Sequence, residues 1–419
     1  MQRSIVLTLL LVALVLLIIE QRDVGRVHAD DGPLVLDESL TDTVLRSYAG
    51  RRLSRRVARV WGLDPELARD IILAQAIHYP LDADQWLNLA RIEASRADGQ
   101  SSPLSSHLNA AVAVNAGNNN TLWRSAQIAL QAGDYALAEG FLYRWLLDQP
   151  QKVDLVLITA GRWLADPADL IERVLPEGPE FLARSMQFAG RQNNLALGAA
   201  LWERMGQDIS LDDPVLLDYV DLLLRSGETE QAMEVWARHD PEYRPGGVVN
   251  GSFSRPLGES AGLNWQTGGG SADVDIALDD AQFASAPASL RIHFKKKNVR
   301  LNRPSILIPV STEGFYRLSG KWRGEGLTTR SLPYLRLDVP GTRQRHRLDV
   351  PAPDFDWSDW SMTASVPAGA SRLVFRVQRD TTEAFDRYIE GDLWLDSIEL
   401  ERIEDLDAPP LTAVDHDAG

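Results

Sequence analysis

Aromatic side chains in the last third of the chain are the residues best suited to ligand recognition. The flat face of an aromatic ring can stack on the apolar CH face of a pyranose, and charged groups nearby can bond the sugar hydroxyls. The candidate contacts for a saccharide are Trp265, Arg323, Tyr334, Trp357, Trp360 and Tyr388. The chemistry that these residue types favour is recognition of a hydroxylated ring.

Few residues are spaced for catalysis. The sequence has no His-Glu-x-x-His metal motif and no glycine loop followed by Lys-Ser or Lys-Thr that would hold phosphate. Its histidines are widely separated, without metal-ligand spacing. Because there is no cysteine, disulfides, thiolate metal sites and cysteine nucleophiles are excluded. We predict that the protein is not an enzyme, and the alternative is a polysaccharide-modifying enzyme.

The composition is that of an acidic globular protein. Of its 419 residues, 44% are hydrophobic, which is normal for folded domains. The formal net charge is -16. A protein that follows nucleic-acid phosphates needs a net basic face to displace counterions, so we expect no nucleic-acid partner.

The N-terminus carries a membrane-targeting pattern. Residues 4–19 form an uncharged apolar run that follows Arg3 and precedes Glu20. The run lies between a signal-peptide core and a full membrane helix in length. We predict a signal anchor or signal peptide at 1–22 and a linker at 23–36. The predicted location is the bacterial inner membrane, as a single-pass protein with periplasmic domains, and the alternative is a soluble periplasmic or secreted protein after cleavage.

Residues 37–242 have the periodicity of helices. Their apolar residues recur at helical spacing, with short Gly, Asn and Pro breaks. Turns that need a left-handed backbone are predicted at Gly133, Asn193 and Gly227. Small residues that let two helices approach closely follow five positions later, at Ala138, Gly198 and Ala232.

This register resembles tetratricopeptide repeats, which are helix pairs of about 34 residues with small residues where the helices cross. Gly198 and Ala232 stand one such period apart. The resemblance covers roughly residues 82–241 and implies an all-α solenoid whose concave groove binds a protein partner. The alternative is an irregular helical bundle.

Helical periodicity ends near 241–247, where Pro and Gly cluster. Short alternating segments bounded by turn residues then predict the strands of an all-β antiparallel sandwich over 247–403. The predicted strands span 289–294, 305–309, 316–322, 334–339, 371–378 and 393–400. The Asp-rich segment 354–360 is predicted as a loop, and 404–419 as an acidic, frayed tail.

The two ends of this domain look like the first and last strands of carbohydrate-binding modules with the galactose-binding-like jelly-roll fold. The domain opens with Asn-Gly-Ser-Phe at 250–253 and closes with Asp-Leu-Trp-Leu-Asp-Ser-Ile-Glu-Leu at 392–400. The resemblance implies polysaccharide binding and, as the one cofactor, a structural calcium ion. Asp396 is the candidate metal ligand, and the alternative is a plain strand-edge carboxylate. Ser254 departs from the family, which often has a glutamate there.

Several residues of this domain have an alternative interpretation. Trp322 and Trp394 lie in alternating strands and are predicted to be core, while the alternative for Trp357 and Trp360 is to seal one end of the sandwich. The basic run at 295–303 is either a solvated strand end or a dock for an anionic polysaccharide or lipid headgroups.

Together these patterns predict a multidomain protein with an N-terminal membrane or signal helix, a repeat-like solenoid and a jelly-roll sandwich. The combination resembles accessory proteins encoded with bacterial exopolysaccharide or O-antigen assembly systems. It implies a membrane-tethered scaffold in polysaccharide assembly or export. The competing hypothesis is a pure protein assembly factor whose sandwich binds no glycan.

Overall fold

The computed structural model describes residues 65–95, 103–205, 209–258, 261–268, 273–383 and 385–404. The chain forms two compact units that divide between Phe181 and Leu182. The predicted leader at 1–22, the linker at 23–36 and the tail from 405 onward lie outside the described residues. The domain boundaries drawn from the sequence stay predictions.

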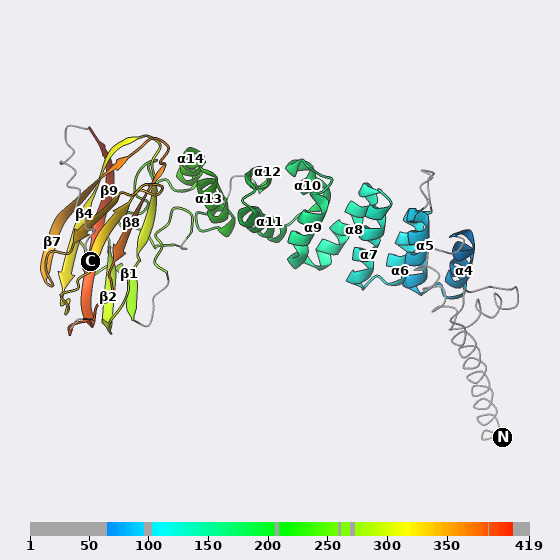
Figure 1. Ribbon diagram of the computed structural model, residues 1–419, viewed down its shortest axis with the longest axis horizontal. Helices are drawn as coiled ribbons and strands as arrows, with labels where there is room; N and C mark the ends of the chain where they lie inside the picture. Colours follow the sequence, from blue (N-terminus) through cyan, green and yellow to red (C-terminus); the bar gives the residue numbers. More distant parts are fainter. Residues whose placement is uncertain are drawn as a thin grey trace, which may run out of the picture. The chain divides into compact units, whose positions relative to one another are not determined.

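The first unit is helical in its described part. Successive helices lie next to one another as antiparallel neighbours (Figure 1). They are α4 (Pro65–His78), α5 (Ala83–Ser95), α6 (Leu104–Val114), α7 (Asn119–Gln131), α8 (Tyr135–Asp148), the short η1 (Pro150–Lys152), α9 (Val153–Ala160) and α10 (Pro167–Val174). Helices α7, α8 and α10 begin at a side-chain cap: Asp134, for example, accepts the N–H of Leu137 at 3.1 Å. The predicted helical region is confirmed, and its assignment to tetratricopeptide repeats stays a prediction.

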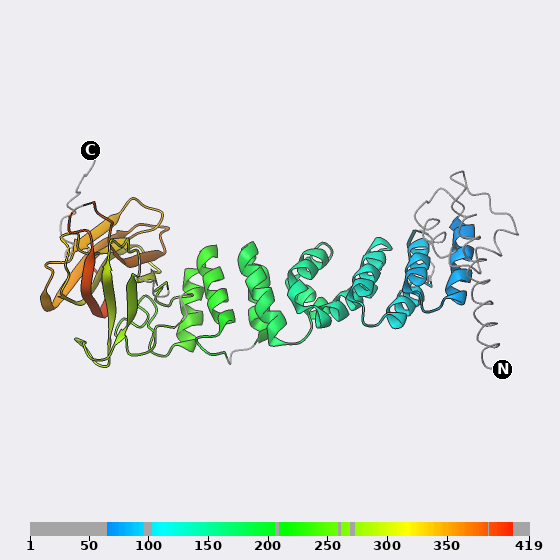
Figure 2. The same ribbon diagram turned by 90° about the horizontal axis from the view of Figure 1, so that it is seen from below.

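Four further helices, visible again in Figure 2, precede the sandwich: α11 (Pro179–Gln192), α12 (Leu195–Met205), α13 (Pro214–Ser226) and α14 (Thr229–His239). The predicted left-handed turns are confirmed, because φ is +75° at Gly133, +50° at Asn193 and +87° at Gly227. The predicted close approach at Gly198 is also found. A Cβ added there would lie 2.4 Å from Cδ2 of Leu222 on α13.

No helix in the described part of the chain is long and apolar enough to cross a membrane. The helices of the first unit contain at most 14 residues and bury only one face, whereas a membrane crossing needs about 20 apolar residues. The prediction of a single-pass inner-membrane protein with periplasmic domains is wrong on this finding. The apolar run at 4–19, which motivated it, lies outside the described residues.

The β region is a sandwich of two antiparallel sheets (Figure 1). The five-stranded sheet has the order β1 (Val274–Asp279), β2 (Ser289–Lys297), β9 (Ile389–Ile403), β4 (Gly314–Glu325) and β7 (Phe355–Val366). The four-stranded sheet has the order β3 (Ser305–Pro309), β8 (Arg372–Gln378), β5 (Tyr334–Asp338) and β6 (Arg345–Asp349). Strands far apart in sequence are neighbours in both sheets, as in a jelly roll.

Aromatic rings fill the space between the two sheets. Trp360 of β7 stacks on Phe375 of β8, with ring centres 5.4 Å apart and planes 4° from parallel. Trp265 meets the same phenylalanine edge-on, at 6.1 Å. Because side chains alternate between the faces of a strand, the core is built from every second residue.

The prediction of a loop at 354–360 was wrong, because most of this segment belongs to β7. The strand pairs with β4 from Val366 back to Phe355. Strand β7 is the edge strand of its sheet. In its first half, Asp356, Ser358 and Asp359 are exposed. Their polarity hides the alternation that a half-buried strand normally shows. Strands β1 and β6 were also missed.

The predicted linker at 241–247 is packed between α14 and the sandwich within the second unit. Tyr243 is buried, and Trp236 of α14 is buried and donates its indole N–H to Asp240 at 3.1 Å. Arg255 forms an ion pair with Asp240. On the sandwich side, Ile398 donates its N–H to the carbonyl of Gly251 at 2.8 Å.

Gly262 makes a close contact at this junction. Its φ is +60°, and an added Cβ would lie 2.6 Å from Cζ3 of Trp236. Gly262→Ala is expected to lower the free energy of unfolding by about 3 kcal/mol, from backbone strain plus overpacking. Gly341→Ala is the matched control, because Gly341 has φ +86° with nothing within 4 Å, and it should cost about 1 kcal/mol. Urea unfolding of both variants measures this, and equal losses would contradict the packing of Gly262 on Trp236.

Asp221 of α13 makes the stability of this junction depend on pH. Its carboxylate accepts the N–H of Gly262 at 3.1 Å, and burial raises its pKa to about 6 from an ordinary 3.8. A raised pKa in the folded state means that the stabilisation is complete below about pH 4 and is lost as pH rises through about 6. Asp221→Asn should therefore gain stability relative to the wild type by about 2 to 3 kcal/mol between pH 4 and pH 8. Urea unfolding at the two pH values checks this, and a difference that does not change with pH would contradict it.

Candidate functional site

The outward face of the five-stranded sheet gathers aromatic, basic and acidic side chains. In β2, Leu290, Ile292 and Phe294 point inward and are fully buried. The alternation of the strand therefore places Arg291 and His293 on the outward face. The residues of β9 that pair with these two also lie on the outward face, because directly paired residues share one face of a sheet.

Trp394 lies at the centre of this face, and its side chain is buried at 4% exposure. It is the direct cross-strand neighbour of Arg291 on one side and of Arg323 on the other. The guanidinium carbon of Arg323 is 5.5 Å from the centre of the indole ring, and that of Arg291 is 6.0 Å from it. Cations at this range are attracted to the electron-rich ring face. The indole N–H donates to Asp279 at 2.9 Å, which fixes the ring in the plane of the sheet face.

A second row of polar residues runs beside the first. Asp392 is in register with His293 of β2 and with Glu325 of β4. Nε of Arg291 donates to Asp392 at 2.6 Å, and Nδ1 of His293 lies 2.9 Å from the same carboxylate oxygen. Nη2 of Arg323 donates to Glu325 at 2.9 Å. We call the six residues of the two rows the Trp394 cluster: Arg291, Trp394, Arg323, His293, Asp392 and Glu325.

These contacts favour the charged forms of Arg291 and Asp279. The hydrogen bond to Asp392 raises the pKa of Arg291 above its ordinary value. Burial acts to raise the pKa of Asp279, but the hydrogen bonds from Trp394 and from two backbone N–H groups outweigh it and lower the pKa. A charged donor and a charged acceptor beside the indole suit binding to a ligand rich in hydroxyls.

The loop between β1 and β2 borders the cluster, and Asp396 anchors it. Asp396 is fully buried, and its Oδ2 accepts the N–H groups of Ala284 and Ser285 at 2.8 and 2.7 Å. Its Oδ1 accepts from the backbone N–H of Ser397 at 2.6 Å. Nearby, the side chain of Gln282 accepts from Arg323 at 2.6 Å. Asp396 therefore holds the loop against the sheet.

Asp396 does not fit a metal ligand in this geometry. Its oxygens receive N–H donors in the positions where a calcium ion would need lone pairs. In the part of the chain that the structure covers, no group of three His, Asp or Glu side chains is placed to hold a metal ion. A structural calcium ion stays a prediction from the sequence.

Two of the predicted sugar contacts lie in the core. Trp265 is 1% exposed and donates its indole N–H to the carbonyl of Val249 at 3.0 Å. Trp360 is 4% exposed and stacks on Phe375. Neither ring has a face open to a ligand in this conformation, because the inner surfaces of the two sheets cover them. Trp322, predicted to be core, is buried beside Trp360.

The remaining candidates lie on different surfaces. Arg323 belongs to the Trp394 cluster. Tyr334 is on the outward face of the other sheet, beneath the guanidinium of Arg347 at 3.8 Å. Tyr388 is exposed in the loop before β9, and Trp357 is half-buried on the edge strand β7. The structure therefore does not bring the predicted aromatic residues together into one site.

Sequence reasoning missed most of the Trp394 cluster. The signal was present, since Arg-x-His in β2, Arg-x-Glu in β4 and Asp-x-Trp in β9 each put two functional side chains on the same strand face. Their convergence depends on the order β2-β9-β4, which joins strands far apart in the sequence. Local patterns do not reveal that order.

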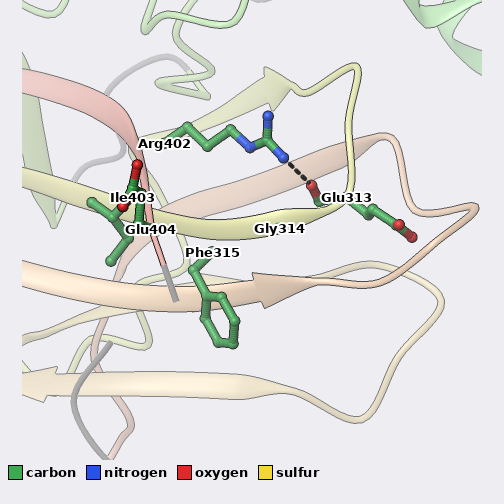
Figure 3. A pocket seen from close by; sticks show the side chains of 6 residues that line it. All are labelled: Glu313, Gly314, Phe315, Arg402, Ile403 and Glu404. Atoms are coloured by element: carbon green, nitrogen blue, oxygen red, sulfur yellow. Dashed lines mark hydrogen bonds between the residues drawn. The ribbon is translucent and has the colours of Figure 1, made fainter. Parts of the chain in front are cut away.

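A shallow pocket of about 570 Å³ lies where β4 begins and β9 ends (Figure 3). It is lined by Glu313, Gly314, Phe315, Arg402, Ile403 and Glu404. Arg402 donates to the carbonyl of Glu313 at 3.0 Å, and the ring of Phe315 points away from that guanidinium (Figure 3). The side chains do not converge on a common point, so the pocket offers less for recognition than the Trp394 cluster.

Residues 258–262 match the Gly-x-Ser-x-Gly pattern of serine hydrolases. Such a serine needs a sharp turn from a strand into a helix. The described residues on either side, up to Gly258 and from Ala261, form neither a strand nor a helix. Ser260 itself lies outside the described residues. The surroundings therefore give no support to a hydrolase site here.

No protein-family model and no curated protein matches the sequence. Among solved structures, similarity is found to the CBM22-1 xylan-binding domain from Paenibacillus barcinonensis Xyn10C, with 18% identity over 32% of this chain and 85% of that one, at a TM-score of 0.22. Family 16 Carbohydrate Binding Module-2 shows 12% identity over 37% of this chain and 99% of that one, at 0.26. The enzymatically active domain of bacteriophage CBA120 tailspike protein 4 shows 11% identity over 32% of this chain, at 0.26, and only 18% of its own length is covered. Likeness at these TM-scores assigns neither a ligand nor a site to this chain.

Proposed function

We propose that the sandwich binds carbohydrate through the Trp394 cluster on the outward face of its five-stranded sheet. The observation that carries this proposal is the row Arg291, Trp394 and Arg323, in which two guanidiniums flank one indole across three neighbouring strands. Guanidinium and carboxylate groups bond sugar hydroxyls. The indole of Trp394 is 4% exposed and lies beneath the two guanidiniums, so it serves as the platform that positions them.

The cluster residues are held in place by their contacts, and this lowers the entropy cost of binding a ligand. Five of the six cluster residues form a polar contact with another member, and Arg323 also donates to Gln282 of the β1–β2 loop at 2.6 Å. Preformed groups lose little side-chain entropy when a ligand binds. We infer a non-catalytic role, with the helical region serving as a scaffold, in polysaccharide assembly or export.

A second candidate function is protein binding by the helical region. Tyr135 and Leu147 of α8 and Leu155 and Ile158 of α9 are large apolar side chains with at least 39% of their surface exposed. Exposed apolar groups on neighbouring helices favour a protein partner. If the protein is a scaffold, it would bind this protein partner and a glycan. If it is a pure assembly factor, it would bind the protein partner alone.

Affinity gel electrophoresis of the full chain separates these functions. Gels would contain xylan, hydroxyethyl cellulose, mannan or dextran, and we expect at least one polymer to retard the protein without release of reducing sugar. If none of a broad panel retards it, the pure assembly factor is favoured. Release of reducing sugar would instead indicate the polysaccharide-modifying enzyme.

A further inference from the structure

The outward face of the four-stranded sheet carries a row of arginines. Arg336 of β5 is the direct cross-strand neighbour of Arg376 on β8 and of Arg347 on β6. Adjacent strands lie about 4.8 Å apart, so the three residues span about 10 Å. Like charges directly opposite one another in a sheet repel and destabilise it. The three arginines of this row therefore repel one another, and a bound anion would reduce this repulsion.

The row is open to solvent. Leu335, Leu337 and Phe375, which alternate with these arginines, point inward and are fully buried. The side chain of Arg347 is 55% exposed, and those of Arg336 and Arg376 retain 23% and 25%. The guanidiniums are therefore partly ordered by their surroundings and still accessible to a ligand.

The charge on this face is only partly balanced. Within these four fully described strands, the outward-facing charged residues are five arginines against two aspartates, which leaves an excess of three positive charges: Arg336, Arg345, Arg347, Arg372 and Arg376 against Asp338 and Asp349. Asp380, just after β8, accepts the hydroxyl of Tyr334 at one end of the row. The whole chain has a net charge of -16, so the excess is a local feature.

Asp338 shows how a carboxylate fits between these guanidiniums. Its Oδ1 accepts from Nε of Arg336 at 2.7 Å, and its Oδ2 lies 3.2 Å from Nη2 of Arg376. Among the described residues, Nε of Arg376 is buried and has no hydrogen-bond partner. Arg347 lies over the ring of Tyr334 at 3.8 Å, and its Nε and Nη2 donate to Asp349 at 2.8 and 2.6 Å, so a ligand carboxylate would replace this exposed aspartate.

We propose that this arginine row, formed by Arg336, Arg347 and Arg376, binds the carboxylates of a linear acidic polysaccharide. A guanidinium presents a planar pair of donors that matches a carboxylate, and a polyuronate carries one carboxylate on every sugar ring. A single chain therefore carries several carboxylates that can reach more than one arginine of the row. The inference goes beyond the proposed function, because the Trp394 cluster is on the other sheet. Arginine clusters also bind acidic peptides, so poly-glutamate is the competing ligand in the experiment below.

Affinity gels with polygalacturonate, poly-glutamate and dextran test this proposal on the full chain. The wild type should be retarded by polygalacturonate, and less strongly as the salt concentration increases. Dextran is uncharged, so the arginine row should contribute nothing to any retardation by dextran. The double variant Arg347→Gln with Arg376→Gln should bind polygalacturonate about tenfold more weakly or worse. The matched control, Lys295→Gln with Lys297→Gln, removes the same charge from exposed residues of β2 and should keep nearly full affinity.

Three results would overturn the proposal: no retardation of the wild type, equal weakening in the two double variants, or binding of poly-glutamate as tight as that of polygalacturonate. Circular dichroism verifies that the variants are folded. If the double variant does not fold, Arg347→Gln alone serves, because its side chain is the most exposed of the three. Retardation by a neutral polysaccharide should persist in the double variant, so failure of this proposal is distinguishable from failure of the Trp394 cluster.

Discussion

Arg379→Met is expected to lower the free energy of unfolding of the sandwich by about 4 kcal/mol. The guanidinium of Arg379 is fully buried and donates to three backbone carbonyls, those of Val299, Ser331 and Arg387. These carbonyls belong to three separate loops at one end of the sandwich. Methionine fills similar space but leaves all three acceptors without a donor, and unsatisfied buried acceptors are costly.

Urea unfolding followed by near-UV circular dichroism measures this loss. Arg330→Met is the matched control, because Arg330 is exposed in one of the same loops, and its replacement should change stability by less than about 0.5 kcal/mol. Burial lowers the pKa of Arg379, and the charges of Asp380 and Asp386 act in the opposite direction. Similar losses in both variants would show that Arg379 does not hold the loops together.

The double replacement Arg291→Met with Arg323→Met should abolish most carbohydrate binding. Each guanidinium flanks the indole of Trp394, and each is oriented by a carboxylate, Asp392 for Arg291 and Glu325 for Arg323. Loss of two charged donors is expected to weaken the affinity about thirtyfold or more, since a hydrogen bond from a charged group contributes about 1.5 to 3 kcal/mol. Affinity gels with the polysaccharide that retards the wild type measure this change.

Arg317→Met provides the control for this experiment. Arg317 is on the same strand and the same outward face, but it pairs with Glu401 far from Trp394. The control should keep wild-type affinity, and the double variant should keep a wild-type circular dichroism spectrum. An unchanged affinity in the double variant would exclude the Trp394 cluster as the binding site.

The helices could be predicted from the sequence because their determinants are local. The turns at Gly133, Asn193 and Gly227 follow from residues that tolerate a left-handed backbone, and Gly198 marks a helix crossing because nothing larger fits against Leu222. Six of the nine strands could be predicted for the same reason. Strand β7 could not, since its exposed edge half is as polar as a loop.

The site could not be predicted from the sequence because it depends on which strands become neighbours. Trp394 was predicted to be core from its place in an alternating strand, and its side chain is indeed buried. It is buried on the outward face of the sheet, beneath Arg291 and Arg323, and the sequence did not indicate those neighbours. Trp265 and Trp360 were predicted as sugar contacts from their aromatic rings alone, and the fold places both between the sheets. Residue type gives the chemistry, and strand order decides which side chains meet.

The central claim is that a glycan binds at the Trp394 cluster, over the guanidiniums that cover the indole, and an NMR titration of the indole N–H signals tests it most directly. The chain has 12 tryptophans, and Trp394→Phe assigns the signal in question. On addition of a polysaccharide fragment that binds, the Trp394 signal should shift or broaden while those of the core residues Trp265 and Trp360 stay in place. A bound fragment that leaves the Trp394 signal unmoved would contradict the claim.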